Sequence, residues 1–305
     1  MPQFPFPRSC KKSLNVLAAL LAVAGGGNAS AELWVYDGFQ YEPLTQLREN
    51  LAASDSLSEG FSGGWNDNSV GIVQPDGLTY GSLLTHGGSL WHQGVREAQR
   101  PLDLGALPAL AGLSEIWISF LLRRDSYPIP EHTGDYAILN MAYPRVGATL
   151  AYRLQIGKRT SVDGELYFQH GIFPSGLVVA EPVNNESAQL GLGETKLIVF
   201  KLSLDVDGTN DFGQMFVNPT LGESAPGVAP IAESPMNLLK WFQTVGFNSS
   251  VDVVEGSPSE FVFDEFRMGS TYADVTPTIP EPSSLLLLGT AGAALIGSRR
   301  RRKAA

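Results

Sequence analysis

Cysteine is nearly absent from this sequence of 305 residues. The single Cys10 lies in an N-terminal segment that we expect to be removed. The mature protein would then hold neither a disulfide nor a thiol for catalysis. Cys10 also comes before the first apolar stretch and not after it, which argues against attachment of a lipid at this position.

Positive charge is scarce between the two ends of the chain. Eight of the 21 basic residues lie at the termini, so residues 32–279 hold 13 basic residues against 30 acidic ones, a net charge of about −17. Such a body repels nucleic acid and anionic lipid, and we expect neither as its partner. Cations, neutral glycans and simple solubility are all compatible with this charge.

Familiar catalytic motifs and internal repeats are missing as well. The sequence has no Gly-x-Ser-x-Gly, no phosphate-binding loop and no dinucleotide fingerprint. It has no repeat with a period of roughly 20 to 50 residues, which argues against a propeller or a solenoid.

The N-terminus has the parts of a secretion signal. Three basic residues between positions 8 and 12 precede the apolar stretch 14–24, and the small residues Ala29, Ser30 and Ala31 follow. We expect a signal helix, with cleavage after Ala31 by a signal peptidase. A permanent membrane helix would need about 20 apolar residues, and the glycines at 25–27 interrupt the run too early.

The C-terminus has an apolar segment followed by a basic end. Residues 285–297 are apolar and uncharged, and with the flanking serines they would form roughly 24 Å of helix, which spans a bilayer only with thinning or snorkelling. Positive charges resist translocation, so the basic run should stay in the cytoplasm as an anchor and place the body outside the inner membrane. The basic anchor consists of Arg299, Arg300, Arg301 and Arg302, followed by Lys303.

Just before this helix lies a short motif, Pro280, Glu281 and Pro282. Motif, apolar segment and arginine cluster together resemble the PEP-CTERM sorting tail of exported Gram-negative proteins. The resemblance covers about the last 26 residues and implies that a membrane transpeptidase of the exosortase type cuts near the motif. It also implies an association with exopolysaccharide and biofilm. The alternative is a proline-rich linker before an ordinary tail anchor.

The segment between the two ends predicts an all-β fold, an antiparallel β-sandwich or jelly roll. Short runs with period-two alternation or β-branched and aromatic enrichment are separated by glycine, proline, asparagine and aspartate. The predicted strands are residues 33–36, 115–123, 136–141, 149–156, 165–169, 196–205, 212–217, 242–248 and 261–268. Only 44–53 and 236–242 are predicted to be short helical turns. The expected organisation is a signal peptide (1–31), a sandwich domain (32–276) and a sorting tail (277–305).

Several phrases of the body carry a second resemblance. The body resembles concanavalin A-like, LamG-type sandwiches, which host lectins, hydrolases and structural modules alike. The phrases are Tyr36-Asp37-Gly38-Phe39, Gly60-Phe61 with Trp65, Leu78 with Tyr80, Trp117 with Phe120, Asn218-Pro219-Thr220, Phe263-Asp264-Glu265-Phe266-Arg267, and Thr271 with Asp274. This resemblance implies the fold and leaves the activity open.

Acidic residues offer two candidate sites. Period two places Glu260 and Asp264 on one face of a strand and Glu265 on the other. A glycosidase would need two carboxylates that flank a cleft, and this spacing does not match the Glu-x-Asp-x-x-Glu strand pattern of laminarinase-like hydrolases. The alternative is edge charges with an Asp264 that fixes a loop. The segment that holds Asp205, Asp207 and Asp211 has oxygen ligands around a glycine, so it is a candidate calcium site or a metal-free hairpin turn. No other cofactor is expected.

The remaining candidates are aromatic residues and histidines. Trp65, Trp91 and Trp241 could stack on sugar rings, although large aromatics more often fill a core. His86 and His92 flank Trp91 without a third ligand, so a zinc or catalytic role is not expected.

Together these features predict a non-enzymatic protein of the cell envelope or extracellular matrix. Its partners would be a signal peptidase, an exosortase-type transpeptidase and extracellular polysaccharide, with the inner membrane holding the C-terminal transmembrane helix before processing. The alternative is a secreted carbohydrate-active hydrolase on the same fold.

Overall fold

The computed structural model describes residues 32–45, 58–67, 71–94, 96–126, 135–144, 151–158, 165–173, 176–180, 189–205, 210–238, 240–250 and 259–279. The predicted signal peptide and the predicted tail from Pro280 onward lie outside these ranges. Within them, no helix has the length and apolar character needed to cross a membrane.

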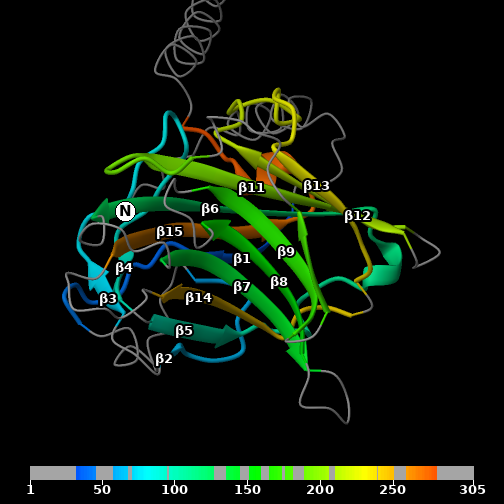
Figure 1. Ribbon diagram of the computed structural model, residues 1–305, viewed down its shortest axis with the longest axis horizontal. Coiled ribbons are helices and arrows are strands. Elements are labelled where there is room, and N and C mark those ends of the chain that lie inside the picture. Colours follow the sequence, from blue (N-terminus) through cyan, green and yellow to red (C-terminus); the bar gives the residue numbers. More distant parts are fainter. Residues whose placement is uncertain are drawn as a thin grey trace, which may run out of the picture.

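The described chain forms two antiparallel sheets that stack face to face (Figure 1). One sheet has eight strands, in the order β13 (Ala232–Met236), β12 (Asp211–Val217), β11 (Thr195–Ser203), β6 (Glu115–Ser126), β15 (Glu260–Gly269), β4 (Ser89–Gln93) and β3 (Ile72–Gln74), with β1 (Leu33–Asp37) also pairing with β15. The other has seven, in the order β10 (Gly176–Ala180), β9 (Leu166–Phe173), β8 (Ala151–Lys158), β7 (Tyr136–Pro144), β14 (Thr244–Ser250), β5 (Arg96–Pro101) and β2 (Asn66–Asp67). The fold is therefore a β-sandwich.

The main core fills the space between the two sheets. Alternate residues of each strand point inward, so one face of every strand is apolar. Phe247 of β14 meets Phe263 of β15 across the sheets at 4.9 Å between ring centroids. Phe168 and Phe200 make the same kind of contact at 5.0 Å. These aromatic pairs join the layers at two separate places.

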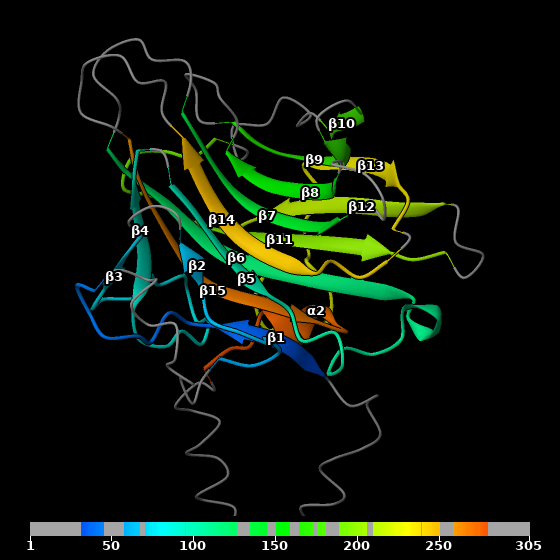
Figure 2. The same cartoon turned by 90° about the horizontal axis from the view of Figure 1, so that it is seen from below.

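A second, smaller core lies on the outer face of the eight-stranded sheet. There the loop 75–88 and the short helix α2 (Tyr272–Val275) cover the sheet, as Figure 2 shows for α2. Leu78 and Leu83 of the loop pack with Tyr272 of the helix and with Trp117 of β6. Strand β6 is therefore apolar on both faces, which explains its nearly continuous hydrophobic run.

Each of the nine predicted strand segments coincides with an observed strand. The predicted helical turn at 236–242 is wrong, because Met236 ends β13 and the described residues after it form a loop. The backbone N–H of Leu238 donates to the Asp211 carboxylate, and the Trp241 indole donates to the Pro108 carbonyl. These tertiary contacts override the helical propensity. The other predicted turn, 44–53, is described only at its first two residues.

Candidate functional site

Backbone hydrogen bonds hold each end of the described body. The backbone N–H of Ser270, directly after β15, donates to the Glu32 carbonyl at 3.1 Å, because β1 pairs with β15. At the other end the Ile279 N–H donates to the Ser82 carbonyl at 2.9 Å. The described residues thus begin at Glu32, directly after the predicted cleavage site at Ala29 and Ala31, and end at Ile279, one residue before Pro280.

The outer face of the seven-stranded sheet carries a row of amide side chains. Register places Gln99 opposite Gly246, Gly246 opposite Asn140, Asn140 opposite Gln155, and Gln155 opposite Gln169. The Gln155 amide donates to Asn140 at 3.4 Å, and Gln169 donates to Gln155. The row crosses five strands, β5, β14, β7, β8 and β9, over roughly 19 Å at about 4.8 Å per strand. Its hydrogen bonds join Asn140, Gln155 and Gln169, whereas Gly246 has no side chain and the Gln99 amide donates to Glu97.

Burial along this row is uneven. Asn140 and Gln155 at its centre are 3% and 6% exposed, whereas Gln99 and Gln169 toward its ends are partly exposed. In the neighbouring row the side-chain oxygen of Asn248 is buried and accepts no hydrogen bond from a described residue. A buried acceptor without a donor is costly, so this oxygen would gain from a donating ligand.

Sequence reasoning missed the amide row. Each amide stands alone at an outward position of its own strand, as Asn140 does between the apolar residues Leu139 and Met141. That isolation is the only signal in the sequence. Pairing registers between distant segments are needed to bring the amides together.

The strongly acidic strand β15 does not form a catalytic pair. Asp264 accepts the Leu78 backbone N–H at 2.7 Å. Glu265 accepts the His86 backbone N–H and pairs with Arg267. Both carboxylates are buried and occupied by loop backbone and arginine, so they hold structure.

The predicted placement of Glu265 on the opposite face is wrong. A bulge interrupts the register with β6 between Asp264 and Arg267, and Glu265 adopts a φ of +54°. The extra residue turns the Glu265 side chain toward the same loop that Asp264 holds. Glu260 lies apart, where its carboxylate accepts from the Gln93 amide at 3.1 Å.

Burial changes the acidity of this carboxylate pair. Desolvation, followed by repulsion from Glu265, raises the pKa of Asp264 well above its ordinary value. Desolvation also raises the pKa of Glu265, against the opposing effect of Arg267.

The candidate calcium site is only partly described. Asp207 lies outside the described residues. Asp211 is buried, and its two oxygens accept the backbone N–H groups of Asp205, at 3.0 Å, and Leu238. The described residues contain no cluster of three or more groups arranged to hold a metal ion. Calcium binding stays a prediction.

The three candidate tryptophans have different surroundings. Trp65 is buried and donates to Asp37 at 3.1 Å. Trp241 packs edge-on against Trp34. Trp91 alone lies half-buried on the outer face of the eight-stranded sheet, beside the second core.

The two histidines are separated by the fold. His92 is fully buried beneath the sheet and contacts Phe263, whereas the His86 ring packs edge-on against Tyr36. Alternation along β4 puts His92 inside and Trp91 outside, so the two histidines do not form one site.

Comparison with known proteins identifies the tail. Residues 278–302 match the PEP-CTERM protein-sorting motif. The chain carries a PEP-CTERM tail. Such a tail implies a secreted protein that an exosortase sorts and processes. No curated protein sequence matches the chain.

Solved structures resemble the body in shape. Domain 4 of AbnA, a GH43 extracellular arabinanase from Geobacillus stearothermophilus in complex with arabinotriose, is 12% identical with a TM-score of 0.43, over 79% of this chain and 93% of that one. The endo-1,3-beta-glucanase from Streptomyces sioyaensis is 10% identical with a TM-score of 0.46, over 80% and 98%. At such values a likeness assigns no substrate or activity to this chain.

Proposed function

We propose that this PEP-CTERM protein works beyond the inner membrane as a non-enzymatic envelope or matrix module that binds neutral extracellular polysaccharide. An exosortase-type transpeptidase releases it from its C-terminal anchor near Pro280, Glu281 and Pro282. The anchor before processing is the apolar segment 285–297 with the basic run that follows it.

The proposal rests on the position of the described body, which lies between the two predicted processing sites. Backbone pairing begins next to Glu32, the first residue after the predicted signal cleavage, and the last described pairing is made by Ile279. Processing at both sites would leave the sandwich whole. Because Ser270 pairs with Glu32, the N-terminal start of the body and the end of β15 lie side by side.

On the outer face of the seven-stranded sheet, the placement of carboxylates favours binding over hydrolysis. Glycoside hydrolysis needs two carboxyl groups about 5 to 9.5 Å apart. On the outer face of the seven-stranded sheet, Glu97 on β5 and Glu165 next to β9 are four strands apart, roughly 19 Å along the sheet. The amides Asn248, Asn140 and Gln155 lie between them, and amides donate to and accept from sugar hydroxyls without doing acid–base chemistry.

The charge of the body selects the kind of polysaccharide. Residues 32–279 carry about −17, so an anionic chain would be repelled at the low ionic strength at which such forces are strong. We therefore assign the amide row a neutral glycan.

The sorting part is tested by changing Glu281 to Ala in the full chain, with Ser284→Ala as the matched control in the same tail. The Glu281→Ala protein is exported, loses its signal peptide and keeps its tail, so its mass exceeds that of the wild type and it stays with the membrane fraction. A mature mass and a cell-surface fate equal to the wild type would show that the motif is not read.

The binding part is tested on the mature exported protein with a glycan array and a reducing-sugar assay. The double variant Gln99→Ala/Gln169→Ala should lose binding, because both partly exposed amides of the row are removed. Gln214→Ala is the control, since Gln214 is a partly exposed amide on the other sheet that donates to Glu233, as Gln99 donates to Glu97. Release of reducing ends from any polysaccharide would favour the hydrolase instead.

A further inference from the structure

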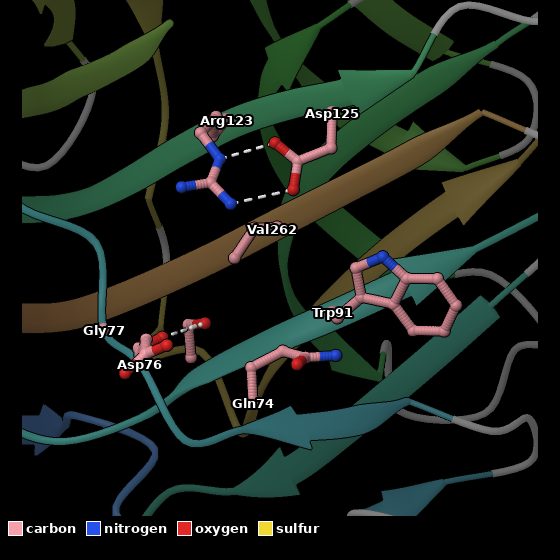
Figure 3. Close-up of a pocket in the computed structure, with 8 residues that line it drawn as sticks. Gln74, Asp76, Gly77, Trp91, Arg123, Asp125 and Val262 are labelled. Atoms are coloured by element: carbon pink, nitrogen blue, oxygen red, sulfur yellow. Dashed lines mark hydrogen bonds and ion pairs between the residues drawn. The ribbon is translucent and has the colours of Figure 1, made fainter. Parts of the chain in front are cut away.

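A pocket of about 380 Å³ lies on the outer face of the eight-stranded sheet, on the opposite side of the sandwich from the amide row. This volume falls within the range of small-molecule sites, roughly 300 to 1,000 Å³. Figure 3 shows its walls, which come from four neighbouring strands and one loop. The lining residues are Gln74, Asp76, Gly77, Ser89, Trp91, Arg123, Asp125 and Val262.

An apolar side chain, Val262, lies at the centre of the pocket next to an aromatic ring. Register places Trp91 of β4 opposite Val262 of β15, and Val262 opposite Arg123 of β6. Trp91 and Arg123 are thus two strands apart, about 10 Å along the sheet, with Val262 between them. In Figure 3 the Trp91 indole lies on one side of Val262 with its ring face toward the viewer, and the Arg123 guanidinium lies on the other side.

One wall is a neutral, forked ion pair. Arg123 and Asp125 project from alternate positions of β6, and the Arg123 Nη2 lies 2.8 Å from the Asp125 Oδ2. Both side chains are partly exposed, at 33% and 26%. A surface pair of this kind adds little stability, but it offers planar donors and acceptors side by side.

The other walls have polar groups with spare hydrogen-bonding capacity. Within the described part of the chain, neither the Gln74 amide, the Asp76 carboxylate nor the Trp91 indole N–H makes a hydrogen bond. These groups are therefore available to form hydrogen bonds with a ligand or with water.

The rim of the pocket is fixed in place. The Ser89 hydroxyl donates to the Asp76 carbonyl at 2.8 Å, and the Leu78 N–H donates to Asp264 at 2.7 Å. A Cβ on Gly77 would lie 2.7 Å from the Gly87 carbonyl oxygen, so only glycine fits where the loop crosses itself. The site is thus built before a ligand arrives, which lowers the entropic cost of binding.

We propose that this pocket binds one neutral sugar unit, a chain end or a branch, stacked on Trp91 and hydrogen-bonded by Arg123, Asp125 and Gln74. The apolar face of a pyranose can stack on the indole ring. Its hydroxyls can hydrogen-bond with the guanidinium of Arg123 and the carboxylate of Asp125. Arg123 and Asp125 cancel in charge and Asp76 adds a negative one, so an anionic sugar is excluded.

The pocket and the amide row lie on opposite faces of the sandwich, and a joint role for them rests on the proposed function, glycan binding by the amide row. Two glycan sites on opposite faces of one sandwich would let a single molecule link two polysaccharide chains. Linking two weak sites raises the overall avidity without any new contact.

The test uses the mature exported protein and three variants, Trp91→Ala, Trp91→Phe and Gln99→Ala/Gln169→Ala. The probes are neutral tetrasaccharides of β-1,4-glucose, β-1,3-glucose and α-1,6-glucose. Their binding is measured by calorimetry and by tryptophan fluorescence. Gln74→Ala serves as a second probe of the pocket, because its side chain is on the rim and its loss leaves the second core intact. Thermal unfolding of every variant shows whether it is folded.

We expect Trp91→Ala to weaken binding of at least one probe about tenfold, and Trp91→Phe to restore most of it. Gln74→Ala weakens the same probe, and the amide-row double variant leaves this binding unchanged. Turbidity of a polysaccharide bearing that sugar, which reports cross-linking, falls in Trp91→Ala and in the double variant alike.

Equal affinity of wild type, Trp91→Ala and Gln74→Ala for every probe would overturn the pocket proposal, even if the amide-row variant loses binding and the proposed function stands. Conversely, loss of binding only at the pocket would overturn the amide row and the cross-linking together. Preference for a sulfated or uronic-acid chain over the neutral probes, or release of reducing ends that stops in Asp125→Asn, would also contradict a neutral binding site.

Discussion

Asp264 and Glu265 are consecutive residues of β15, yet their carboxylates hold the two halves of one loop. Asp264 accepts the N–H of Leu78 and Glu265 accepts the N–H of His86. The bulge at Glu265 makes this arrangement possible. This loop covers the second core. The two adjacent carboxylates therefore hold the loop 75–88 in place on the outer face of the eight-stranded sheet.

Stability should fall as the pH rises from about 4 toward neutrality. Burial raises the pKa of Asp264 and of Glu265 in the folded state, whereas in the unfolded chain such groups titrate near 4. Between the unfolded and the folded pKa the native state binds more protons, so the free energy of unfolding decreases with rising pH. The stabilising effect is complete below the unfolded pKa and is lost through the folded one.

The measurement is the free energy of unfolding in urea from pH 4 to pH 8. Asp264→Asn should flatten the slope, because one raised pKa and its repulsion with Glu265 disappear. Glu223→Gln, at an exposed loop position, is the control. An unchanged slope in Asp264→Asn would show that the carboxylate is not protonated in the native state above pH 4.

Removal of the Asp135 carboxylate should strongly destabilise the sandwich. Asp135 is fully buried and accepts from Lys158 at 2.6 Å, Arg124 at 2.6 Å and Ser259 at 2.7 Å. Asp135→Ala leaves two buried cations without their shared anion, at a cost of about 3 to 5 kcal/mol. Ser259→Ala removes only a neutral partner and should cost about 1 kcal/mol. Urea unfolding separates the two, and equal small losses would contradict the buried ion cluster.

Arginine at position 100 should not be replaceable by lysine. Its guanidinium binds the Gly63 carbonyl through Nε at 2.7 Å and Asp37 through Nη1 at 2.8 Å, while Trp65 donates to the same Asp37 oxygen. A lysine ammonium cannot reproduce this fork. Arg100→Lys should lower the free energy of unfolding by about 1 to 3 kcal/mol and shift the Trp65 fluorescence. Wild-type stability in Arg100→Lys would show that charge alone matters there.

Local patterning predicted nine of the strands and missed six described ones, β2, β3, β4, β5, β10 and β13. It also did not predict which neighbours each face of a strand contacts. The run in β6 is apolar at every position from Ile116 to Leu122 except Ser119, because Phe120 faces the main core and Leu121 faces the second one. Nothing in the run itself distinguishes two cores from one. The loop 75–88, which creates the second core, is far away in sequence.

The candidate sites depend on register and backbone geometry that short-range patterns do not contain. A period-two count along β15 fails at Glu265, because a non-glycine residue with a positive φ inserts there. Gln155 and Gln99 share a row only after β7 and β14 have paired between them. Trp91 could be named from the sequence as a sugar platform, but its partner Arg123 could not.

We expect backbone N–H groups, and not a metal ion, to hold the carboxylate of Asp211. Its oxygens accept the N–H groups of Asp205 and Leu238, which fixes the start of β12 and the loop after β13. Asp211→Ala should therefore cost about 1 to 3 kcal/mol of stability. Because backbone groups occupy the oxygens, the loss should be equal in calcium and in a chelator. Thermal unfolding under both conditions decides the point. A wild-type melting temperature that rises with calcium, and does not rise in Asp211→Ala, would instead establish a calcium site formed with Asp207.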